Sequence, residues 1–287
     1  FKPDILFTNN LAGFSTRVWS IAKTLDIKIV HTLRDYYLQC PKTVKFRDNK
    51  NCEKLCFDCN VLSFLKKKNT IKVDFVIGIS KYILYDHLDK DYFKDVSNKI
   101  IYNGFNNKLV KPSLENKILT FGFIGQINKS KGIELLLKSL SNLHHLNWRL
   151  LIAGKIDKKY LDYLNTINKS KKIEYLGYVD KSIFFSKIDL LIVPSLWNEP
   201  FGRVIIESLY HNKPVLGSER GGIPELLRYN KKFIFAPNEE DLTILLEKII
   251  NYKSILTDFK FDENFLNKFS KEKIIKLYID VFNTVLK

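Results

Sequence analysis

Two glutamates at a fixed separation mark the segment of this chain with the most chemical content. Glu199 and Glu207 lie eight residues apart in Glu-Pro-Phe-Gly-Arg-Val-Ile-Ile-Glu, shortly after the apolar run 189–195. We interpret that run as a buried parallel strand and the residues after Gly202 as the start of a helix. Helix N-terminal N–H groups bind anions, and carboxylates accept hydrogen bonds from the hydroxyls of a polyol. This combination predicts a site for a nucleotide sugar.

The same nine residues also fit an ordinary helix start. Arg203 and Glu207 are four residues apart, so they could form a helix-surface ion pair of little energetic weight. Glu199 could be an acid that complements the helix dipole. These nine residues alone do not distinguish the two interpretations, so motifs elsewhere in the chain are needed.

The four cysteines form a second candidate group, because all of them fall in one segment with little apolar periodicity. Their spacing, C-x11-C-x3-C-x2-C, could close a tetrahedral thiolate site for zinc. A cytosolic setting disfavours disulfides, so the alternatives to a structural zinc are unpaired thiols or, less favoured, disulfides. The candidate ligands are Cys40, Cys52, Cys56 and Cys59.

Short apolar runs alternate with helical patterns along the whole chain, and these elements must position the candidate residues. The alternation predicts α/β domains with parallel, doubly wound sheets. In the first half we expect strands near 5–7, 27–30, 75–79 and 99–102, with helices near 15–25 and 81–90. In the second half we expect strands near 119–124, 149–153, 173–176, 190–193, 214–216 and 233–235.

Length and composition limit the class of protein. A chain of 287 residues can form two domains with developed cores, and 45% hydrophobic residues without a long uncharged apolar run predict no membrane span. The net charge of +16 comes mostly from lysines spread along the chain. The densest group, Lys66 to Lys68, follows an apolar stretch and fits either an anionic membrane surface or a solvated helix end. We expect a cytoplasmic location, either free or peripheral at the inner face of the membrane.

The domain boundary is predicted in the polar segment 107–116, which contains a proline. Residues 1–112, with the Cys-rich loop 40–59, would form one Rossmann-like domain. Residues 113–287 would form a second one that includes a final helix from Ser270 to Lys287. The chain has no methionine and begins within an apparent strand, so we expect a piece of a longer protein.

The order of motifs resembles the retaining glycosyltransferases of family 4. The likeness covers most of the chain and is densest from 119 to 227. The resemblance implies the GT-B fold, in which two doubly wound Rossmann-like domains enclose the active site in a cleft, with the N-terminal domain incomplete here. The residues that carry it are Phe123-Ile-Gly125, Lys131-Gly132, Leu151-Ile-Ala-Gly154, Ile173-Glu-Tyr-Leu-Gly177, the two glutamates, and Gly221-Gly-Ile-Pro-Glu225, with Lys2-Pro-Asp4, Val30-His31-Thr32 and Tyr102-Asn-Gly104 in the first half.

The resemblance also implies roles. Glu207 would bind the ribose hydroxyls of the donor and Glu199 the hydroxyls of the transferred sugar. Lys131 would neutralise the leaving diphosphate, and His31 would lie near the donor sugar and the attacking hydroxyl. The implied catalytic residues are therefore His31, Lys131 and Glu199, and the implied donor-binding residues are Gly125, Gln126, Lys131, Glu199, Phe201, Gly202, Arg203, Val204 and Glu207.

One departure from the family pattern affects the phosphate contacts. Many relatives have an arginine where this chain has Gln126, which donates hydrogen bonds but brings no charge. Lys129 or Arg203 could compensate. We expect no catalytic metal, because the one Asp-x-Asp pair, Asp89-Lys-Asp91, fits an exposed helix end.

Two functions of different class follow. The first is a retaining hexosyltransferase that moves a sugar from a nucleoside-diphosphate sugar (UDP or GDP) to a glycan or glycolipid acceptor hydroxyl, in polysaccharide or lipopolysaccharide synthesis. The alternative is a non-catalytic GT-B module that binds nucleotide or polyanion. Nucleic-acid binding rests on charge alone, without a recognition motif, and is not expected.

Overall fold

A computed structural model of the chain describes residues 3–105 and 118–287. The chain divides into two compact units, which are described separately: unit 1 is Phe1–Asn106 with Asn267–Lys287, and unit 2 is Asn107–Leu266. The predicted boundary at 112/113 lies outside the described residues. None of the helices in the described ranges is long and apolar enough to cross a bilayer.

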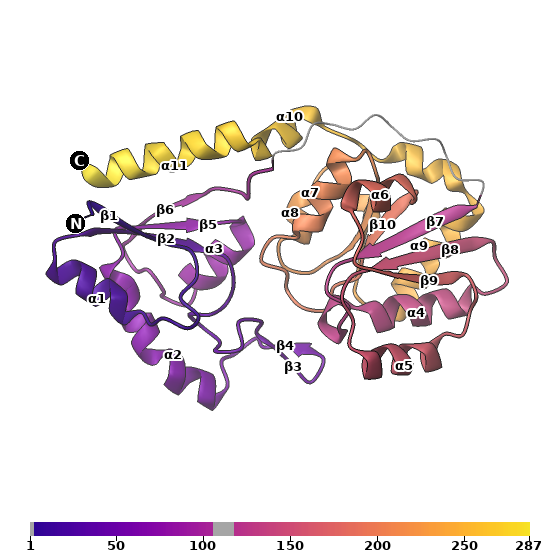
Figure 1. The fold of residues 1–287 in the computed structure, drawn as a ribbon, viewed down its shortest axis with the longest axis horizontal. Coiled ribbons are helices and arrows are strands. Elements are labelled where there is room, and N and C mark those ends of the chain that lie inside the picture. Colours follow the sequence, from indigo (N-terminus) through magenta and orange to yellow (C-terminus); the bar gives the residue numbers. More distant parts are fainter. Residues whose placement is uncertain (1–2, 106–117) are drawn as a thin grey trace. The chain divides into compact units, whose positions relative to one another are not determined.

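Unit 1 is built on a parallel sheet in the order β1-β2-β5-β6. The chain enters through β1 (Ile5–Thr8), α1 (Arg17–Thr24) and β2 (Lys28–Leu33). A long loop holds a two-stranded hairpin, β3 (Phe46–Arg47) and β4 (Lys50–Asn51), before α2 (Phe57–Asn69). Then come β5 (Phe75–Gly78), α3 (Lys81–Leu88) and β6 (Ser97–Ile100). Figure 1 shows these elements in indigo and purple.

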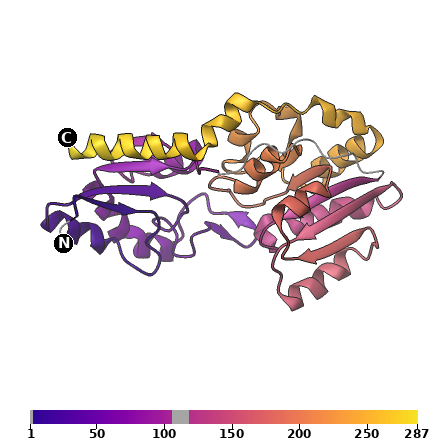
Figure 2. The same cartoon turned by 45° about the horizontal axis from the view of Figure 1, so that its top comes forward.

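The C-terminal helix α11 (Lys271–Leu286) belongs to unit 1, so its assignment to the second domain was wrong. It lies along the sheet of unit 1 in both views (Figures 1 and 2). Ile274 and Val281 on α11 pack into one buried cluster with Val30, Phe75 and Ile77. The helical periodicity correctly predicted a helix in the tail. An amphipathic pattern does not indicate, however, which of the two sheets the helix packs against.

Unit 2 has a six-stranded parallel sheet with helices on both faces. Its first half runs through β7 (Leu119–Ile124), α4 (Ile133–Asn142), β8 (Trp148–Ala153), α5 (Lys158–Ile167), β9 (Ile173–Gly177) and α6 (Lys181–Ser186). Its second half runs through β10 (Leu190–Val193), α7 (Arg203–Tyr210), β11 (Val215–Ser218), α8 (Ile223–Leu226), β12 (Ile234–Phe235), α9 (Glu239–Asn251) and α10 (Glu263–Leu266). Side-chain caps begin several of these helices: Asp157 accepts from Tyr160 N–H before α5, and Asn238 from Asp241 N–H before α9.

The strand order of unit 2, β12-β11-β10-β7-β8-β9, decides where a ligand can bind. The chain builds outward from β7 in one direction, through β8 and β9, and then returns to build from β10 in the other. In such sheets the connections on either side of the reversal point leave on opposite faces and open a crevice at the carboxyl ends of the strands. The reversal here lies between β7 and β10, which pair directly.

Candidate donor site

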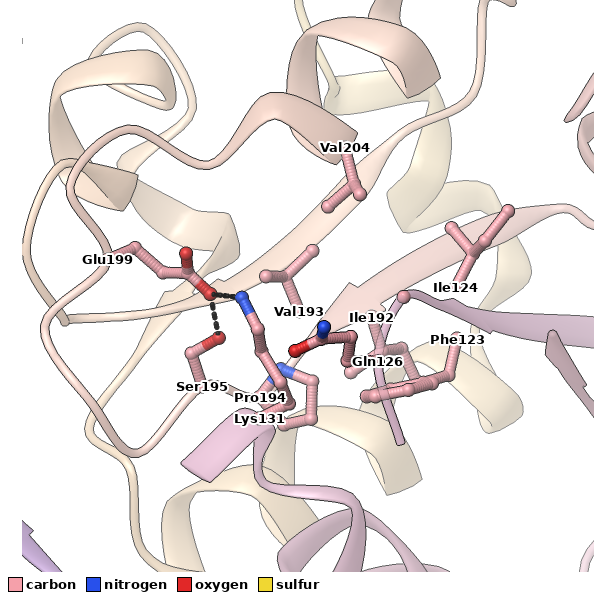
Figure 3. Close-up of a pocket in the computed structure, with 11 residues that line it drawn as sticks. Phe123, Ile124, Gln126, Lys131, Ile192, Val193, Pro194, Ser195, Glu199 and Val204 are labelled. Carbon is pink, nitrogen blue, oxygen red and sulfur yellow. Dashed lines mark hydrogen bonds and ion pairs between the residues drawn. The ribbon is translucent and has the colours of Figure 1, made fainter. Parts of the chain in front are cut away.

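A pocket lies at this reversal point, at the carboxyl ends of β7 and β10. Its cavity volume is about 160 Å³. Residues from both strands and from the loops that follow them form its wall, which is drawn in Figure 3. The lining residues are Phe123, Ile124, Gly125, Gln126, Lys131, Ile192, Val193, Pro194, Ser195, Glu199 and Val204.

Glu199 is the polar centre of this pocket. Its Oε1 atom is 2.6 Å from the Lys131 ammonium and also accepts hydrogen bonds from the Ser195 hydroxyl at 2.8 Å and from the Trp197 indole at 2.9 Å. Figure 3 shows the first two groups converging on one carboxylate oxygen. The Lys131 ammonium also lies 4.9 Å from the centre of the Trp197 ring. The glutamate thus holds the cation in a fixed position beside the pocket.

Two glycines allow the loops around Glu199 and Lys131 to approach each other. Gly132 follows Lys131 at φ 76°, and a Cβ there would lie 1.7 Å from the carbonyl oxygen of Pro194. Gly221 has φ 57°, and its Cβ would lie 2.2 Å from the Glu199 carbonyl oxygen, which accepts a hydrogen bond from Gly222 N–H at 2.7 Å. Both positions require glycine because a side chain would meet backbone atoms that cannot move aside.

Glu207 lies on α7 and is 2% exposed. Its Oε1 atom is 2.6 Å from the Lys181 ammonium and 3.0 Å from Nε of Arg203. The other oxygen, Oε2, is buried and has no hydrogen-bond partner in the part of the chain that the structure describes. A buried acceptor without a partner is costly, so this atom suits a hydroxyl donated by a ligand. Gly202 is the N-cap residue of α7 and has no side chain to cap the helix.

A second pocket, with a cavity volume of about 270 Å³, lies at the carboxyl ends of β7, β8 and β9. It shares Ile124, Gly125 and Gln126 with the first pocket and reaches Lys181, the partner of Glu207. Tyr178 on its rim is 86% exposed, and a ring so placed can stack on a planar group. The two pockets together suit an extended ligand with a planar end, hydroxyls and an anionic middle.

The family follows from comparison with known proteins. The model of the family described as "Glycosyl transferases group 1" matches residues 105–268, more than half of the chain. A protein from Klebsiella pneumoniae, described as an uncharacterized 42.6 kDa protein in the cps region, is 31% identical over 281 residues, 98% of this chain and 72% of the relative. The chain belongs to the group 1 glycosyltransferase family.

Other proteins described as glycosyltransferases are also similar to this chain. An uncharacterized glycosyltransferase of Methanocaldococcus jannaschii is 30% identical over 73% of this chain and 59% of its own length. The O-antigen biosynthesis glycosyltransferase WclY of Escherichia coli is 23% identical over 71% of this chain and 61% of its own length. The chain therefore spans between about six tenths and three quarters of these relatives.

Solved structures show that this glycosyltransferase chain has the GT-B fold. Sucrose-phosphate synthase from Thermosynechococcus elongatus superposes with a TM-score of 0.80 at 21% identity, covering 98% of this chain and 74% of that one. HepE from Anabaena, solved in complex with UDP and glucose, gives a TM-score of 0.73 at 15% identity over 98% of this chain and 78% of that one. The predicted fold class is confirmed.

The structure gathers most of the predicted donor-site residues of the glycosyltransferase chain in unit 2. Gly125, Gln126, Lys131, Glu199 and Val204 line the first pocket. Of the others, Phe201 and Gly202 form the turn before α7, and Arg203 and Glu207 pair on its first two turns. The Arg203–Glu207 pair that the sequence also allowed therefore exists, but Glu207 is buried instead of lying on the helix surface.

His31 lies in the core of unit 1. It is buried on β2 of unit 1, with Nδ1 2.8 Å from the Thr8 hydroxyl and its ring stacked on Phe93 and edge-on to Trp19. Burial lowers the pKa of His31 to about 3, and the charge of His87 adds to this effect. His31 is thus a buried group of the unit 1 core, and the catalytic role that the resemblance implies for it stays a prediction.

Two groups of polar residues in the glycosyltransferase chain were not found from the sequence. Ser195, Trp197 and Lys181 hold the two glutamates, but none of them belongs to a motif that the sequence analysis singled out. At the carboxyl edge of the unit 1 sheet, Arg34 donates to the side chains of Asn9 at 2.8 Å and Asn103 at 2.6 Å. In both cases, the sequence pattern that could have indicated these residues is a polar side chain shortly after an apolar strand.

Proposed function

We propose that this chain is a retaining, family 4-type glycosyltransferase that transfers a hexosyl group from a nucleoside-diphosphate sugar to an acceptor hydroxyl. The observation that carries the proposal is the pocket at the strand reversal of unit 2, where Lys131 is held by Glu199 next to the first turn of α7. Relatives named for O-antigen and capsular polysaccharide biosynthesis support a role in cell-surface polysaccharide or lipopolysaccharide synthesis.

The charges of the site suit departure of a diphosphate. As the bond between the sugar C1 and the phosphate oxygen breaks, its electron pair leaves with the diphosphate, and positive charge develops on the sugar. Lys131 and the backbone N–H groups of Phe201 and Gly202 would stabilise the growing negative charge, each charge-assisted hydrogen bond contributing about 1.5–3 kcal/mol. Arg203 would supply the second cation that Gln126 lacks. This assignment requires no catalytic metal.

The two glutamates would hold the sugar and the ribose. The buried Oε2 atom of Glu207 would accept from a ribose hydroxyl, while Lys181 and Arg203 fix the other oxygen. Glu199 would accept from hydroxyls of the transferred sugar and orient Lys131. The second pocket, with Tyr178 at its rim, would take the base. UDP is the first nucleotide to test, because HepE was solved with UDP and UDP-glucose.

Retention places the acceptor on the face from which the diphosphate leaves. The acceptor oxygen forms the new bond to C1 as the old bond breaks, and the acceptor proton passes to the departing phosphate oxygen. This scheme needs no base on the opposite face of the sugar. It agrees with His31 being buried and neutral, because no imidazole has to take up the proton.

Helix α2 suggests how the chain reaches acceptors built on a membrane. Phe57, Val61, Phe64 and Leu65 recur at helical spacing and are all more than half exposed. Lys66 to Lys68 follow in the last turn, within a chain of net charge +16. An exposed apolar stripe beside lysines fits the surface of an anionic bilayer. We therefore propose peripheral contact at the cytoplasmic face of the membrane.

The test of the reaction uses the full chain with α-linked UDP-glucose and GDP-mannose. Release of the nucleoside diphosphate is followed over time, and the anomer of the released sugar is read by NMR at early times. We expect turnover of one donor, without loss on addition of EDTA, and initial release of the α-anomer. Initial release of the β-anomer would contradict retention. Tight nucleotide binding without turnover would favour the alternative, a non-catalytic binding module.

A further inference from the structure

The four cysteines come together in unit 1, where the long loop after β2 meets the N-terminus of α2. Cys40 is buried near the start of the loop, and Cys52 follows strand β4. Cys56 is the N-cap residue of α2, and Cys59 lies in its first turn. All four are free thiols, and the donor site in unit 2 uses none of them.

Direct contacts link three of the thiols. The Cys59 thiol is hydrogen-bonded to both Cys40 and Cys56. The backbone N–H of Cys59 also donates to the sulfur of Cys56. Cys52 lies near Cys40 and Cys56, close enough for their charges to act on it. Residues that are up to nineteen positions apart in the sequence thus form one sulfur cluster.

The backbone of the loop requires an anchor. Thr43, Lys45, Asp48 and Asn49 all have positive φ between 48° and 64°, a conformation that disfavours side chains. One anchor is visible on the side of α3, where the buried Lys45 ammonium is 2.8 Å from a carboxylate oxygen of Asp86. Between β2 and α2 the regular structure is the short β3–β4 hairpin, next to which Cys52 N–H donates to the Lys45 carbonyl at 2.8 Å. A metal bound by the cysteines would tie this loop to the first turn of α2.

Cationic side chains lie around the cluster. Lys66 is near enough to Cys40 and Cys59 to interact with their charges, and Arg47 and Lys45 act on Cys52 in the same way. Zinc held by four thiolates carries a net charge of −2, which nearby cations partly offset. Cys56 also lies at the positive end of the thirteen-residue helix α2.

From these contacts we propose that Cys40, Cys52, Cys56 and Cys59 bind one structural zinc ion that ties the loop to the first turn of α2. Among residues 3–105 and 118–287, no three His, Cys, Asp or Glu side chains are already arranged as a metal site. On binding zinc, the side chains of Cys40, Cys56 and Cys59 would rotate so that their sulfur atoms face the ion, and the Cys52 sulfur would join them. The four thiols would lose their protons. With four protein ligands the ion has no open position, so it stabilises the fold and takes no part in sugar transfer.

The experiment measures metal in the full chain purified without chelators. We expect one zinc per chain by elemental analysis, and a cobalt-substituted protein with the intense thiolate-to-cobalt absorption of a tetrahedral site. The variants Cys52→Ser and Cys59→Ser should each weaken zinc binding at least tenfold. Asp58→Asn, in the same helical turn, is the matched control and should keep the metal.

Three results would overturn the proposal. One is a folded wild-type chain with four freely reactive thiols and no zinc. Another is a mass that shows disulfides in protein handled under reducing conditions. The third is zinc that persists in both cysteine variants. The cobalt spectrum is read on the unmutated chain, so the test stands even if a variant does not fold.

Discussion

Glu199 holds Lys131 in place, and the backbone of Gly221 lies close against that of Glu199. Gly221→Ala would place a methyl group 2.2 Å from the Glu199 carbonyl oxygen, in addition to the strain of a left-handed residue. We expect a loss of about 3 kcal/mol or more in the free energy of unfolding, from strain plus overpacking, and weaker nucleotide binding. Urea unfolding and titration with UDP measure the two effects.

The matched control is Gly177→Ala. Gly177 also has positive φ, 65°, but a Cβ there meets nothing within 4 Å. Gly177→Ala should lower the free energy of unfolding by only about 1 kcal/mol, the cost of a left-handed conformation. Nucleotide binding should be unchanged. Equal losses in the two variants would mean that the contact with Glu199 has no role.

Two buried histidines predict how stability depends on pH. Burial lowers the pKa of His31 to about 3 and that of His87 to about 4, from 6.5. The unfolded chain therefore binds more protons than the folded chain below pH 6.5, and stability falls as the pH drops from 6.5 toward 4. The loss should be about 2 kcal/mol per histidine at pH 5.

Urea unfolding at pH 7, 6 and 5 checks this dependence. His31→Phe keeps a ring against Phe93 and removes one titrating group, so the loss between pH 7 and 5 should fall by about half. The exposed His144→Gln should keep the full loss. A wild-type stability that does not change over this range would refute the assignment of both histidines as neutral buried groups.

At the scale of elements, α2 is a helix with an apolar stripe that the described part of unit 1 leaves exposed. If the stripe inserts into a bilayer, the double change Phe64→Ser and Leu65→Ser should weaken binding to vesicles of anionic phosphatidylglycerol about tenfold or more, since each side chain loses apolar burial. Ile244→Ser, an exposed apolar residue on α9, is the control. Co-sedimentation measures the binding.

Two results would contradict a membrane contact through α2 and its lysines. If the double variant and the control bind the vesicles equally, α2 is not the contact. If the wild type binds neutral phosphatidylcholine vesicles as well as anionic ones, the lysines play no part in the attraction.

Elements of this chain could be predicted from the sequence to different extents. The strands of unit 2 were found because buried parallel strands are short apolar runs such as Leu190–Val193. The hairpin at Phe46–Arg47 and Lys50–Asn51 was not, because its turn residues Asp48 and Asn49 sit among charged residues without alternation. Family resemblance indicated several residues that line the unit 2 pocket, whereas the partners of Glu207 and the burial of His31 depend on packing between distant segments.

At the scale of the whole molecule, the chain returns from unit 2 to complete the core of unit 1. Ile274 on α11 is 7% exposed and packs with Val30 and Phe75, whereas its neighbour Ile275 is 47% exposed. Ile274→Ala should therefore cost about 2–4 kcal/mol in the free energy of unfolding, and Ile275→Ala less than about 0.5 kcal/mol. Similar effects in urea unfolding would contradict the packing of α11 on unit 1.

The central claim is that unit 2 binds the nucleoside diphosphate of a sugar donor through Lys131 and Glu207. Calorimetric titration of the full chain with UDP, GDP and ADP tests it most directly, beside Lys131→Ala, Glu207→Gln and the exposed control Glu174→Gln. We predict binding of one nucleotide, weakened about 10- to 100-fold in the first two variants and unchanged in the third. Binding of none by the folded wild type, or equal binding by all four proteins, would contradict the claim.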